Sequence, residues 1–422
     1  MKTASLKKRS IKLFPQITRK NSSNYFNKRF AVLSIIFVLT SAIVLAGNPI
    51  LPSPADELRN RGFGNLFNMH YQESKLDFEA IIQNDPNQPA GYIYMGYAIW
   101  LNYLADLRRL QTNVYNKNNA FFDTRKEDKA DAKVDAEFRK NMDKGVELAE
   151  GRLKKNKNDL QAMYYLGVAK NILAGYEATV NRSFFSALRN GSKGVDLHRD
   201  VIEKDPSFID AYLSVGMYDY IVGSLPLAVK VVVFFGGVRG SKKDGLAAVE
   251  KVYHEGVYGK DEAGVLLVML YDREKRRVDS LNVLRDLSKK FPENFLFALE
   301  QAMAQSNLKR FEESYKTFDS ILLNNNAMTR MPDIIHYQYA EALFAGKQWN
   351  AALNHYVEAT KSAKAPESLK TMAMLSEGRC YDAMGQRENA LKRYADVLKR
   401  DEIFNSHDIA KAFQKKPFMP PP

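Results

Sequence analysis

The sequence lacks the residues on which most catalytic and metal sites depend. It contains one cysteine, Cys380, which excludes an internal disulfide bond and a cysteine-based metal site. It has no Gly-x-Ser-x-Gly motif of the kind that presents a serine nucleophile. Its histidines are scattered and none stands four residues from another, as two metal ligands on one helix face would: His70, His198, His254, His336, His355 and His407. We therefore expect no catalytic residue, no cofactor and no metal ion.

Acidic residues are absent from the first 30 positions, which hold nine lysines and arginines. Because the formal net charge of the chain is +13, most of its excess positive charge lies in this lead. The rest of the chain has no basic stripe interleaved with aromatic residues, the pattern typical of a nucleic-acid-binding face. We therefore expect no nucleic-acid partner.

A charge-free run, residues 31–47 (AVLSIIFVLTSAIVLAG), follows the basic lead and is closed by Asn48-Pro49. Its length and flanking charges predict a hydrophobic signal or anchor helix, with residues 1–30 in the cytoplasm and the body across the membrane. Cleavage after Ala46 and retention as an anchor both fit the pattern, and no cysteine follows that would make a bacterial lipoprotein. We expect a bacterial protein anchored in the inner membrane with its body in the periplasm, or one secreted to the periplasm. The acid-free lead also fits a mitochondrial membrane protein as the alternative.

Two segments of similar pattern, within residues 338–402, carry the clearest repeat signal. Small and large apolar residues recur at the spacing of two helices joined by a turn: Ala340, Leu343, Trp349, Ala352, Tyr356 and Ala359, then, with the theme shifted by 38 positions, Gly378, Tyr381, Ala390, Tyr394 and Val397. We expect the small residues where paired helices cross. The pattern resembles the tetratricopeptide repeat (TPR), a helical hairpin of about 34 residues that buries its apolar face by stacking. The resemblance implies an all-α solenoid, a right-handed superhelix.

Composition and spacing divide the chain into six segments. In chain order these are a basic cytoplasmic lead (1–30), a signal or anchor helix (31–47), a proline-rich spacer (48–55), irregular TPR-like repeats (56–260), regular TPR repeats (261–404), and a cap with a disordered tail (405–422). The irregular repeats pause at three expected insertions: 103–138, 175–190 and 221–238. The predicted fold is therefore an all-α, TPR-type solenoid of about eight hairpins with insertions, preceded by a single hydrophobic helix.

A glycine–proline–glycine block lies in the middle of the chain. It consists of Gly216-Met217-Tyr218-Asp219-Tyr220, Ser224-Leu225-Pro226, Gly236-Gly237-Val238-Arg239-Gly240 and Gly245-Leu246. The block resembles a TPR family that includes the fungal mitochondrial-outer-membrane protein involved in clearing inclusion bodies, and bacterial relatives. The resemblance implies a non-enzymatic protein and supplies no catalytic residues.

The TPR resemblance also implies that the leading helix of each hairpin lines a concave groove. In this chain those positions hold mostly aromatic and aliphatic residues: Ile93, Tyr97, Trp100, Tyr164, Asn171, Leu213, Met217, Tyr220, Tyr337 and Phe344. The lysine, asparagine and arginine set of a carboxylate clamp is missing. We expect the groove to bind an apolar helix or strand of a protein partner, or an acyl-bearing ligand. Alternatively, the three insertions fold back and fill it.

Two hypotheses about function follow. The first is a membrane-associated, non-enzymatic scaffold that mediates protein–protein interactions on the extracytoplasmic side. The second is a carrier or sensor of a hydrophobic small molecule or lipid held in the groove of the N-terminal half. A lipid that co-purifies with the protein would favour the second hypothesis, and an empty groove the first.

Overall fold

The computed structural model describes residues 54–110, 130–225 and 239–420. The basic lead, the hydrophobic run at 31–47 and nearly all of the proline-rich spacer lie outside the described residues, so the predicted signal or anchor helix does too. Among the helices that the structure does describe, none combines the length and the apolar character needed to cross a bilayer.

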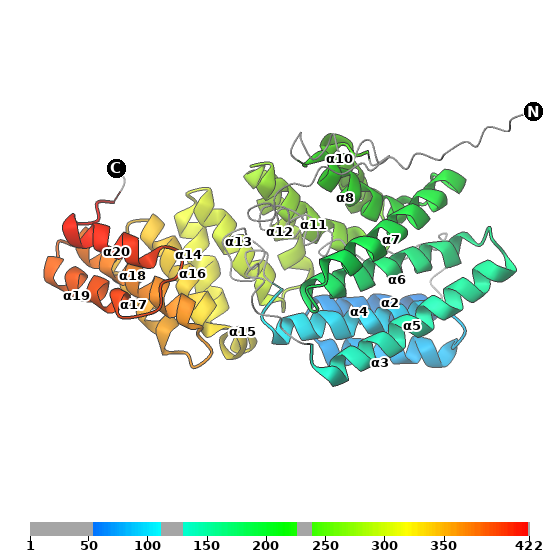
Figure 1. Cartoon of the computed structure of the whole chain (residues 1–422), viewed down its shortest axis with the longest axis horizontal. Coiled ribbons are helices and arrows are strands. Elements are labelled where there is room, and N and C mark those ends of the chain that lie inside the picture. The colour runs from blue at the N-terminus through cyan, green and yellow to red at the C-terminus, as the bar shows by residue number, and fades with distance from the viewer. Residues whose placement is uncertain (1–53, 111–129, 226–238, 421–422) are drawn as a thin grey trace, which may run out of the picture.

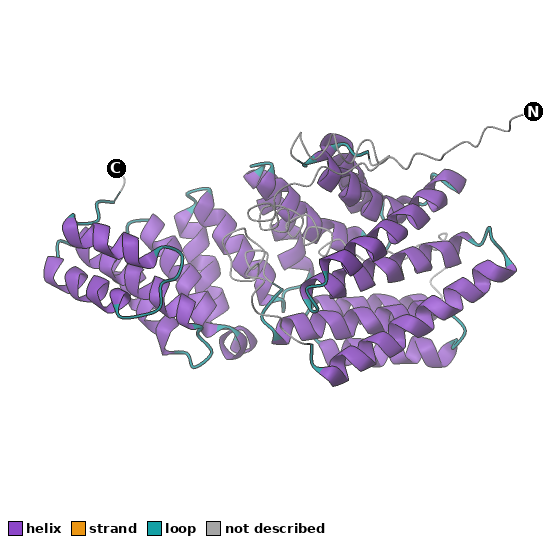
Figure 2. Cartoon of the chain, viewed as in Figure 1, coloured by secondary structure: helices purple, strands orange, loops and turns teal. Residues whose placement is uncertain are grey.

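The described chain is built from paired helices (Figures 1 and 2). In chain order the pairs are α2 (Pro54–Phe67) with α3 (Tyr71–Asn84), α4 (Pro89–Asp106) with α5 (Ala132–Lys155), α6 (Leu160–Thr179) with α7 (Phe184–Lys204), α8 (Tyr212–Gly223) with α10 (Lys242–Glu255), α11 (Lys260–Arg273) with α12 (Arg277–Lys290), α13 (Phe295–Asn307) with α14 (Phe311–Leu322), α16 (Pro332–Ala345) with α17 (Trp349–Lys361), and α18 (Glu367–Ala383) with α19 (Arg387–Leu398). Three short helices stand outside these pairs: η3 (Ile209–Ala211), α15 (Asn325–Arg330) and α20 (Ser406–Lys415). The described residues contain no strand, so the predicted all-α, TPR-type solenoid is confirmed. Its right-handedness stays a prediction.

The hairpins stack along the long axis of the molecule (Figure 1). The second helix of one hairpin contacts the leading helix of the next, as α3 does with α4, α12 with α13, and α17 with α18. Helices α2–α8 gather at one end of the molecule and α14–α20 at the other, with α11–α13 between them. Each hairpin thus covers the apolar face of its neighbour, as a solenoid requires.

Glycines let the two helices of a hairpin approach closely. A Cβ atom added at the leading-helix glycine would overlap a large side chain of the second helix in four hairpins: Gly62 against Phe78, Gly96 against Met142, Gly167 against His198, and Gly378 against Tyr394. Where α8 crosses α10, both sides are glycine, and a Cβ on Gly216 would lie 2.9 Å from the carbonyl oxygen of Gly245. The expectation that small residues mark the crossings is confirmed, because only glycine permits this backbone separation.

A short Asp-Pro sequence ends the first hairpin. The Asp85 carboxylate accepts a hydrogen bond from the Asn87 N–H (3.1 Å), and the Asp85 carbonyl accepts one from the Gln88 N–H (3.1 Å). Pro86 suits the second position of such a turn and cannot extend a helix. The same two contacts recur where α7 ends. These turns set the direction in which each new leading helix starts.

The expected insertion at 175–190 is wrong. Helix α6 continues through this stretch to Thr179, and α7 begins at Phe184. Helices α6 and α7 therefore have 20 and 21 residues, against 12 in α14 and 13 in α17. The sequence departs from a regular repeat here because both arms of the hairpin are lengthened, not because a loop intervenes. Most of the other two expected insertions lies outside the described residues: 111–129 within 103–138, and 226–238 within 221–238.

The tail after α20 also differs from the expected disorder as far as residue 420. The Phe418 N–H donates to the Asp382 carboxylate (2.8 Å). The Phe418 ring lies 5.4 Å from that of Phe413 and 5.7 Å from that of Phe344, measured between centroids. An aromatic anchor in an otherwise polar and proline-rich segment holds the tail against the last two hairpins.

Candidate functional site: a central cavity

The first hairpin contacts the chain more than 200 residues further on. The Asn294 side chain donates to the carbonyl oxygen of Phe67 (2.7 Å), and the Glu293 N–H donates to the Asn68 side chain (3.2 Å). The rings of Phe67 and Phe291 lie 5.0 Å apart. The turn between α2 and α3 therefore packs on the turn between α12 and α13.

A second long-range contact starts at the end of α4. Arg108, whose φ of 57° turns the chain out of the helix, donates to both carboxylate oxygens of Asp333 (2.7 and 2.8 Å). It also donates to the carbonyl oxygen of Lys364 (2.8 Å). The Asp333 side chain is completely buried and the Arg108 side chain is 21% exposed, so the carboxylate end of this ion pair is shielded from water. Together the two contacts tie the first two hairpins to the turn between α12 and α13 and to the start of α16, an arrangement that we call the closure.

Beside the first of these contacts, to which Phe67 and Asn294 belong, lies a cavity of about 140 Å³, which we call the central cavity. Helices α2, α3, α4, α6, α11, α12 and α13 all contribute to its wall. Most of the lining residues are apolar, among them Leu66, Phe67, Leu104, Val268, Leu284 and Phe297. A concave, mostly apolar site with few polar groups is the usual form of a small-molecule pocket.

Several polar groups on the cavity wall are already engaged. The Trp100 indole N–H donates to the Thr179 hydroxyl oxygen (2.9 Å), and that hydroxyl donates to the Gly175 carbonyl (2.8 Å). The Arg109 guanidinium donates to the Thr179 carbonyl (3.2 Å). These bonds fix the orientation of Trp100 and satisfy the end of α6.

Glu262 is the exception on the wall. It lines the cavity and is 3% exposed, and no other described residue donates a hydrogen bond to either of its carboxylate oxygens. Burial raises the pKa of Glu262 well above its ordinary value, and the nearby Asp261 and Asp210 carboxylates raise it further. The backbone N–H of Glu262 itself and Lys290 oppose this shift, and Lys290 forms an ion pair with Asp261 (2.6 Å). The environment therefore favours the protonated carboxyl group, which can donate a hydrogen bond.

Two predicted groove residues, Tyr97 and Trp100, come together on this wall, with ring centroids 5.9 Å apart. They are 6% and 3% exposed. A helix is about 10 Å across with its side chains, so the central cavity is too small to admit a helical peptide. The aromatic pair therefore lines a compact cavity.

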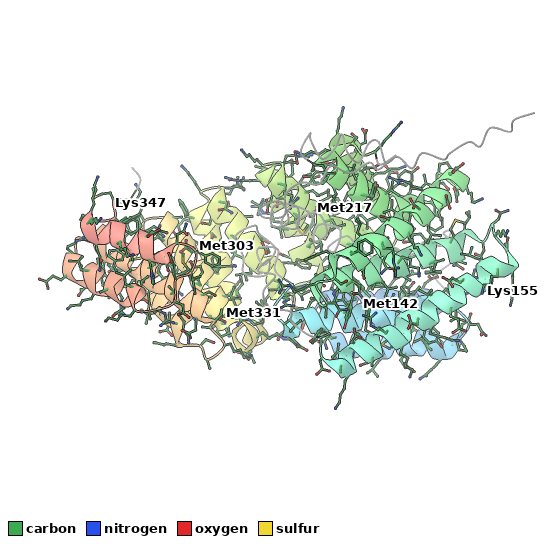
Figure 3. All side chains as sticks on the ribbon, viewed as in Figure 1. Met142, Lys155, Met217, Met303, Met331 and Lys347 are labelled. Atoms are coloured by element: carbon green, nitrogen blue, oxygen red, sulfur yellow. The ribbon has the colours of Figure 1, made fainter. Side chains whose placement is uncertain are left out.

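The other predicted groove residues of the N-terminal half pack between helices and do not line the central cavity: Ile93, Tyr164, Asn171, Leu213, Met217 and Tyr220. Figure 3 places Met217 among the helices of this half. Asn171 lies against Gly194 at the crossing of α6 and α7, and the Tyr220 hydroxyl donates to Glu274 (2.5 Å). Their apolar and aromatic character therefore belongs to interhelical packing.

The last two predicted groove residues lie in the C-terminal half. The Tyr337 ring lies 5.7 Å from that of Tyr356 on the second helix of its own hairpin. The Phe344 ring meets the tail residue Phe418, and the Arg379 guanidinium lies 4.2 Å above the Phe344 ring. Phe344 thus takes part in the contact between the solenoid and its own tail.

Sequence reasoning missed Glu262, Asn294 and Arg108. Glu262 had a detectable signal, because it stands three and six residues before Val265 and Val268, on the apolar face of its helix. Asn294 and Arg108 lie in turns, where no periodic pattern marks a contact partner.

Two histidines that stand apart in the sequence also meet. The Nδ1 atoms of His336 and His355 are 2.9 Å apart. Burial lowers the pKa of both imidazoles, and the neighbouring His336 adds to the effect on His355, whose pKa falls to about 4. Across the described residues, no three His, Cys, Asp or Glu side chains are grouped so that they could hold a metal ion.

His198 is buried at the crossing of α6 and α7. In the neutral imidazole, Nε2 of His198 donates to the Tyr164 carbonyl (3.1 Å), which can only accept, and Nδ1 accepts from the Ser214 hydroxyl (2.6 Å). Burial lowers the pKa of His198 to about 4 and so favours this neutral form, although the bond to Tyr164 opposes the shift.

The His198 geometry predicts a loss of stability in acid. Between pH 6.5 and about 4 the His198 imidazole is protonated in the unfolded chain and neutral in the folded chain. The free energy of unfolding should therefore fall as the pH is lowered through this window. The expected contribution of this one residue is roughly 3 kcal/mol. In urea titrations, the His198→Gln variant should be less stable than the wild type at pH 7. Its free energy of unfolding should then fall by less than that of the wild type between pH 7 and pH 4.5. An identical loss in both proteins would contradict this.

The stacked helical hairpins are those of a TPR protein. Residues 211–414 match the family model described as Iml2/Tetratricopeptide repeat protein 39. The chain is thus a TPR protein with an Iml2-like region, and the resemblance noted in the glycine–proline–glycine block is confirmed. No curated protein matches the chain.

Several solved structures resemble the chain at a low level. The human IFIT1 dimer with m7Gppp-AAAA is 13% identical, with 92% of this chain and 87% of that chain covered and a TM-score of 0.40. YrrB, a TPR protein with an unusual peptide-binding site, is 14% identical, with 64% and 99% covered and a TM-score of 0.33. Yeast Tom70 is 12% identical, with 86% and 82% covered and a TM-score of 0.34. Values this low support no inference from those proteins to this one.

Proposed function

We propose that the protein is a non-enzymatic, membrane-associated scaffold whose last two hairpins hold an extended, apolar segment of a partner protein on the extracytoplasmic side. A TPR solenoid is suited to protein–protein interaction because its stacked helices offer a long continuous surface. The observation that carries the proposal is the docking of the chain's own tail. No nucleic-acid partner and no cofactor is part of it.

The tail shows what this surface can hold. The backbone at Lys416 is extended, with φ −135° and ψ 125°. Two residues later the Phe418 ring lies between aromatic rings and 4.9 Å from the Arg379 guanidinium, while its N–H is bound by Asp382. One aromatic anchor with a backbone hydrogen bond is a common way to hold an extended peptide. We infer that a partner segment with an aromatic anchor competes with the tail for this place.

The test compares capture of partner proteins by three full-length variants. Phe418→Ala vacates the aromatic contact, so it should capture more partner from membrane-envelope extracts than the wild type. Phe418→Ala combined with Arg379→Ala and Phe344→Ala should capture little. Met419→Ala is the matched control, because Met419 is 73% exposed and should leave capture unchanged. Equal capture by all variants would reject this surface.

The location of the protein is part of the proposal. It is supported by the acid-free basic lead and the charge-free run at 31–47. We propose an inner-membrane anchor with the body in the periplasm, or release into the periplasm after cleavage. Protease added to intact spheroplasts should digest the body. Protection of the body, or import into isolated mitochondria, would favour the mitochondrial alternative.

The central cavity favours a second candidate function, a carrier or sensor of a hydrophobic small molecule or lipid. Tyr97 and Trp100, two residues expected to bind such a ligand, line it. Native mass spectrometry of the purified protein should then show an added mass that disappears after organic extraction. A single bare mass would count against this candidate and leave the scaffold proposal in place.

A further inference from the structure

We propose that the central cavity binds a small, uncharged, largely apolar molecule with a hydrogen-bond acceptor, and that the Glu262 carboxyl group donates to that acceptor. The proposal rests on the second candidate function and names the ligand class and its polar contact. It depends on the size of the cavity, the apolar wall and the unpartnered Glu262.

The size of the cavity limits the ligand. An engineered protein cavity of about 150 Å³ with an apolar lining binds benzene. The central cavity, at about 140 Å³, is of the same order. It therefore fits a single ring or a short branched chain and excludes a whole phospholipid.

The apolar wall favours a neutral ligand, because moving an ion of either sign from water into an apolar environment costs free energy. Arg109 on the same wall would in addition repel a cation. Lys290, the cation that acts on Glu262 from outside the cavity, is paired with Asp261. An uncharged molecule avoids the desolvation cost that an ion would meet in this cavity.

The state of Glu262 points to a donated hydrogen bond. A buried polar group without a partner is uncommon in folded proteins and costs stability. The Tyr164 hydroxyl, whose pKa is raised chiefly by burial and to a lesser degree by Asp210 and Glu262, is also buried without a partner. A ligand carbonyl or ether oxygen beside Glu262 would supply the missing acceptor. Hydrogen bonds from the protonated carboxyl then select for molecules that carry such an oxygen.

The two tryptophans allow a direct test. The chain has Trp100 on the cavity wall and Trp349 in α17, so a full-length Trp349→Phe variant reports on Trp100 alone. The purified protein is washed with a mild detergent to remove any molecule that it already holds, and is then dialysed. It is titrated with four probes of similar size. These are acetophenone (neutral, with an acceptor), toluene (neutral, without one), benzoate and benzylammonium. We expect saturable change in Trp100 fluorescence with acetophenone, about five- to tenfold weaker binding of toluene, and none with either ion.

Variants locate the contact. Glu262→Gln keeps a donor and should bind acetophenone within about twofold of the parent, whereas Glu262→Leu should bind acetophenone and toluene equally. Val265→Phe places a ring in the cavity and should weaken acetophenone at least tenfold. Val278→Phe is its control, because Val278 is 48% exposed on α12.

Each contrary result overturns the inference. Tightest binding of benzylammonium, with loss in Glu262→Gln, would show a cation site. Unchanged acetophenone binding in Val265→Phe would place the ligand elsewhere. No saturable binding by any probe would reject the proposed ligand class. Native mass spectrometry of the protein before the detergent wash then shows whether the carrier or sensor function fails with it. An added mass would support that function and reject only the ligand class, whereas the absence of an added mass would reject both.

Discussion

Gly245→Ala is expected to destabilise the fold by about 3 kcal/mol, the upper end of what overpacking usually costs. The added Cβ would overlap two backbone atoms, the Tyr220 nitrogen and the Gly216 carbonyl oxygen. Backbone atoms in packed helices cannot rotate aside as a side chain can. Helices α8 and α10 would have to separate, and the packing of the Iml2-like region begins with this pair. Urea unfolding, followed by circular dichroism, measures the loss.

Gly151→Ala is the matched control for this substitution. Gly151 also lies inside a helix, α5, but a Cβ there would meet no heavy atom within 4 Å. Alanine is the better helix former, so this variant should gain about 0.5 to 1 kcal/mol. If both variants moved the urea midpoint in the same direction, close helix crossing would not be the reason for glycine at position 245.

Arg108→Ala is expected to cost about 3 to 5 kcal/mol, the usual penalty for leaving one member of a buried ion pair alone. Asp333 would keep its buried carboxylate without its bidentate partner, and the carbonyl of Lys364 would lose its donor. The first two hairpins would also lose a tie to the seventh. We therefore expect a lower urea midpoint together with a larger radius of gyration in small-angle X-ray scattering.

Arg285→Ala separates this effect from the general loss of an arginine. Arg285 pairs with Glu313 at 2.7 Å, but both side chains are more than 40% exposed. A surface pair of this kind contributes at most about 1 kcal/mol, and the shape of the molecule should not change. A radius of gyration unaltered in Arg108→Ala would show that the closure persists without this ion pair.

Local pattern was enough to predict how the chain forms hairpins. The spacing of Ala340, Ala352 and Tyr356, and its return at Gly378 and Tyr394, reports contacts between neighbouring helices, and those are set within one repeat. The small residues at helix crossings followed for the same reason. The lengthened arms of α6 and α7 were misread as an insertion, because a longer buried helix and an apolar loop give similar composition.

The cavity and the closure could not be predicted in this way. Whether Tyr97 and Trp100 face a long groove or a compact cavity depends on the small rotation between successive hairpins, summed over several of them. This accumulated rotation also brings Phe67 and Asn294 together, although they are 227 residues apart in the sequence. Groove residues and core residues also obey the same helical period, so Met217 and Tyr220 carried no sign of which they were.

The closure has a consequence for biosynthesis. Phe67 leaves the ribosome 227 residues ahead of Asn294, its eventual partner. At translation rates of about 5 to 20 residues per second, the nascent chain waits roughly 10 to 45 s before that partner emerges. During this interval the apolar surface around Tyr97 and Trp100 is not covered by α11–α13. We therefore expect the nascent chain to bind a chaperone or the translocation machinery.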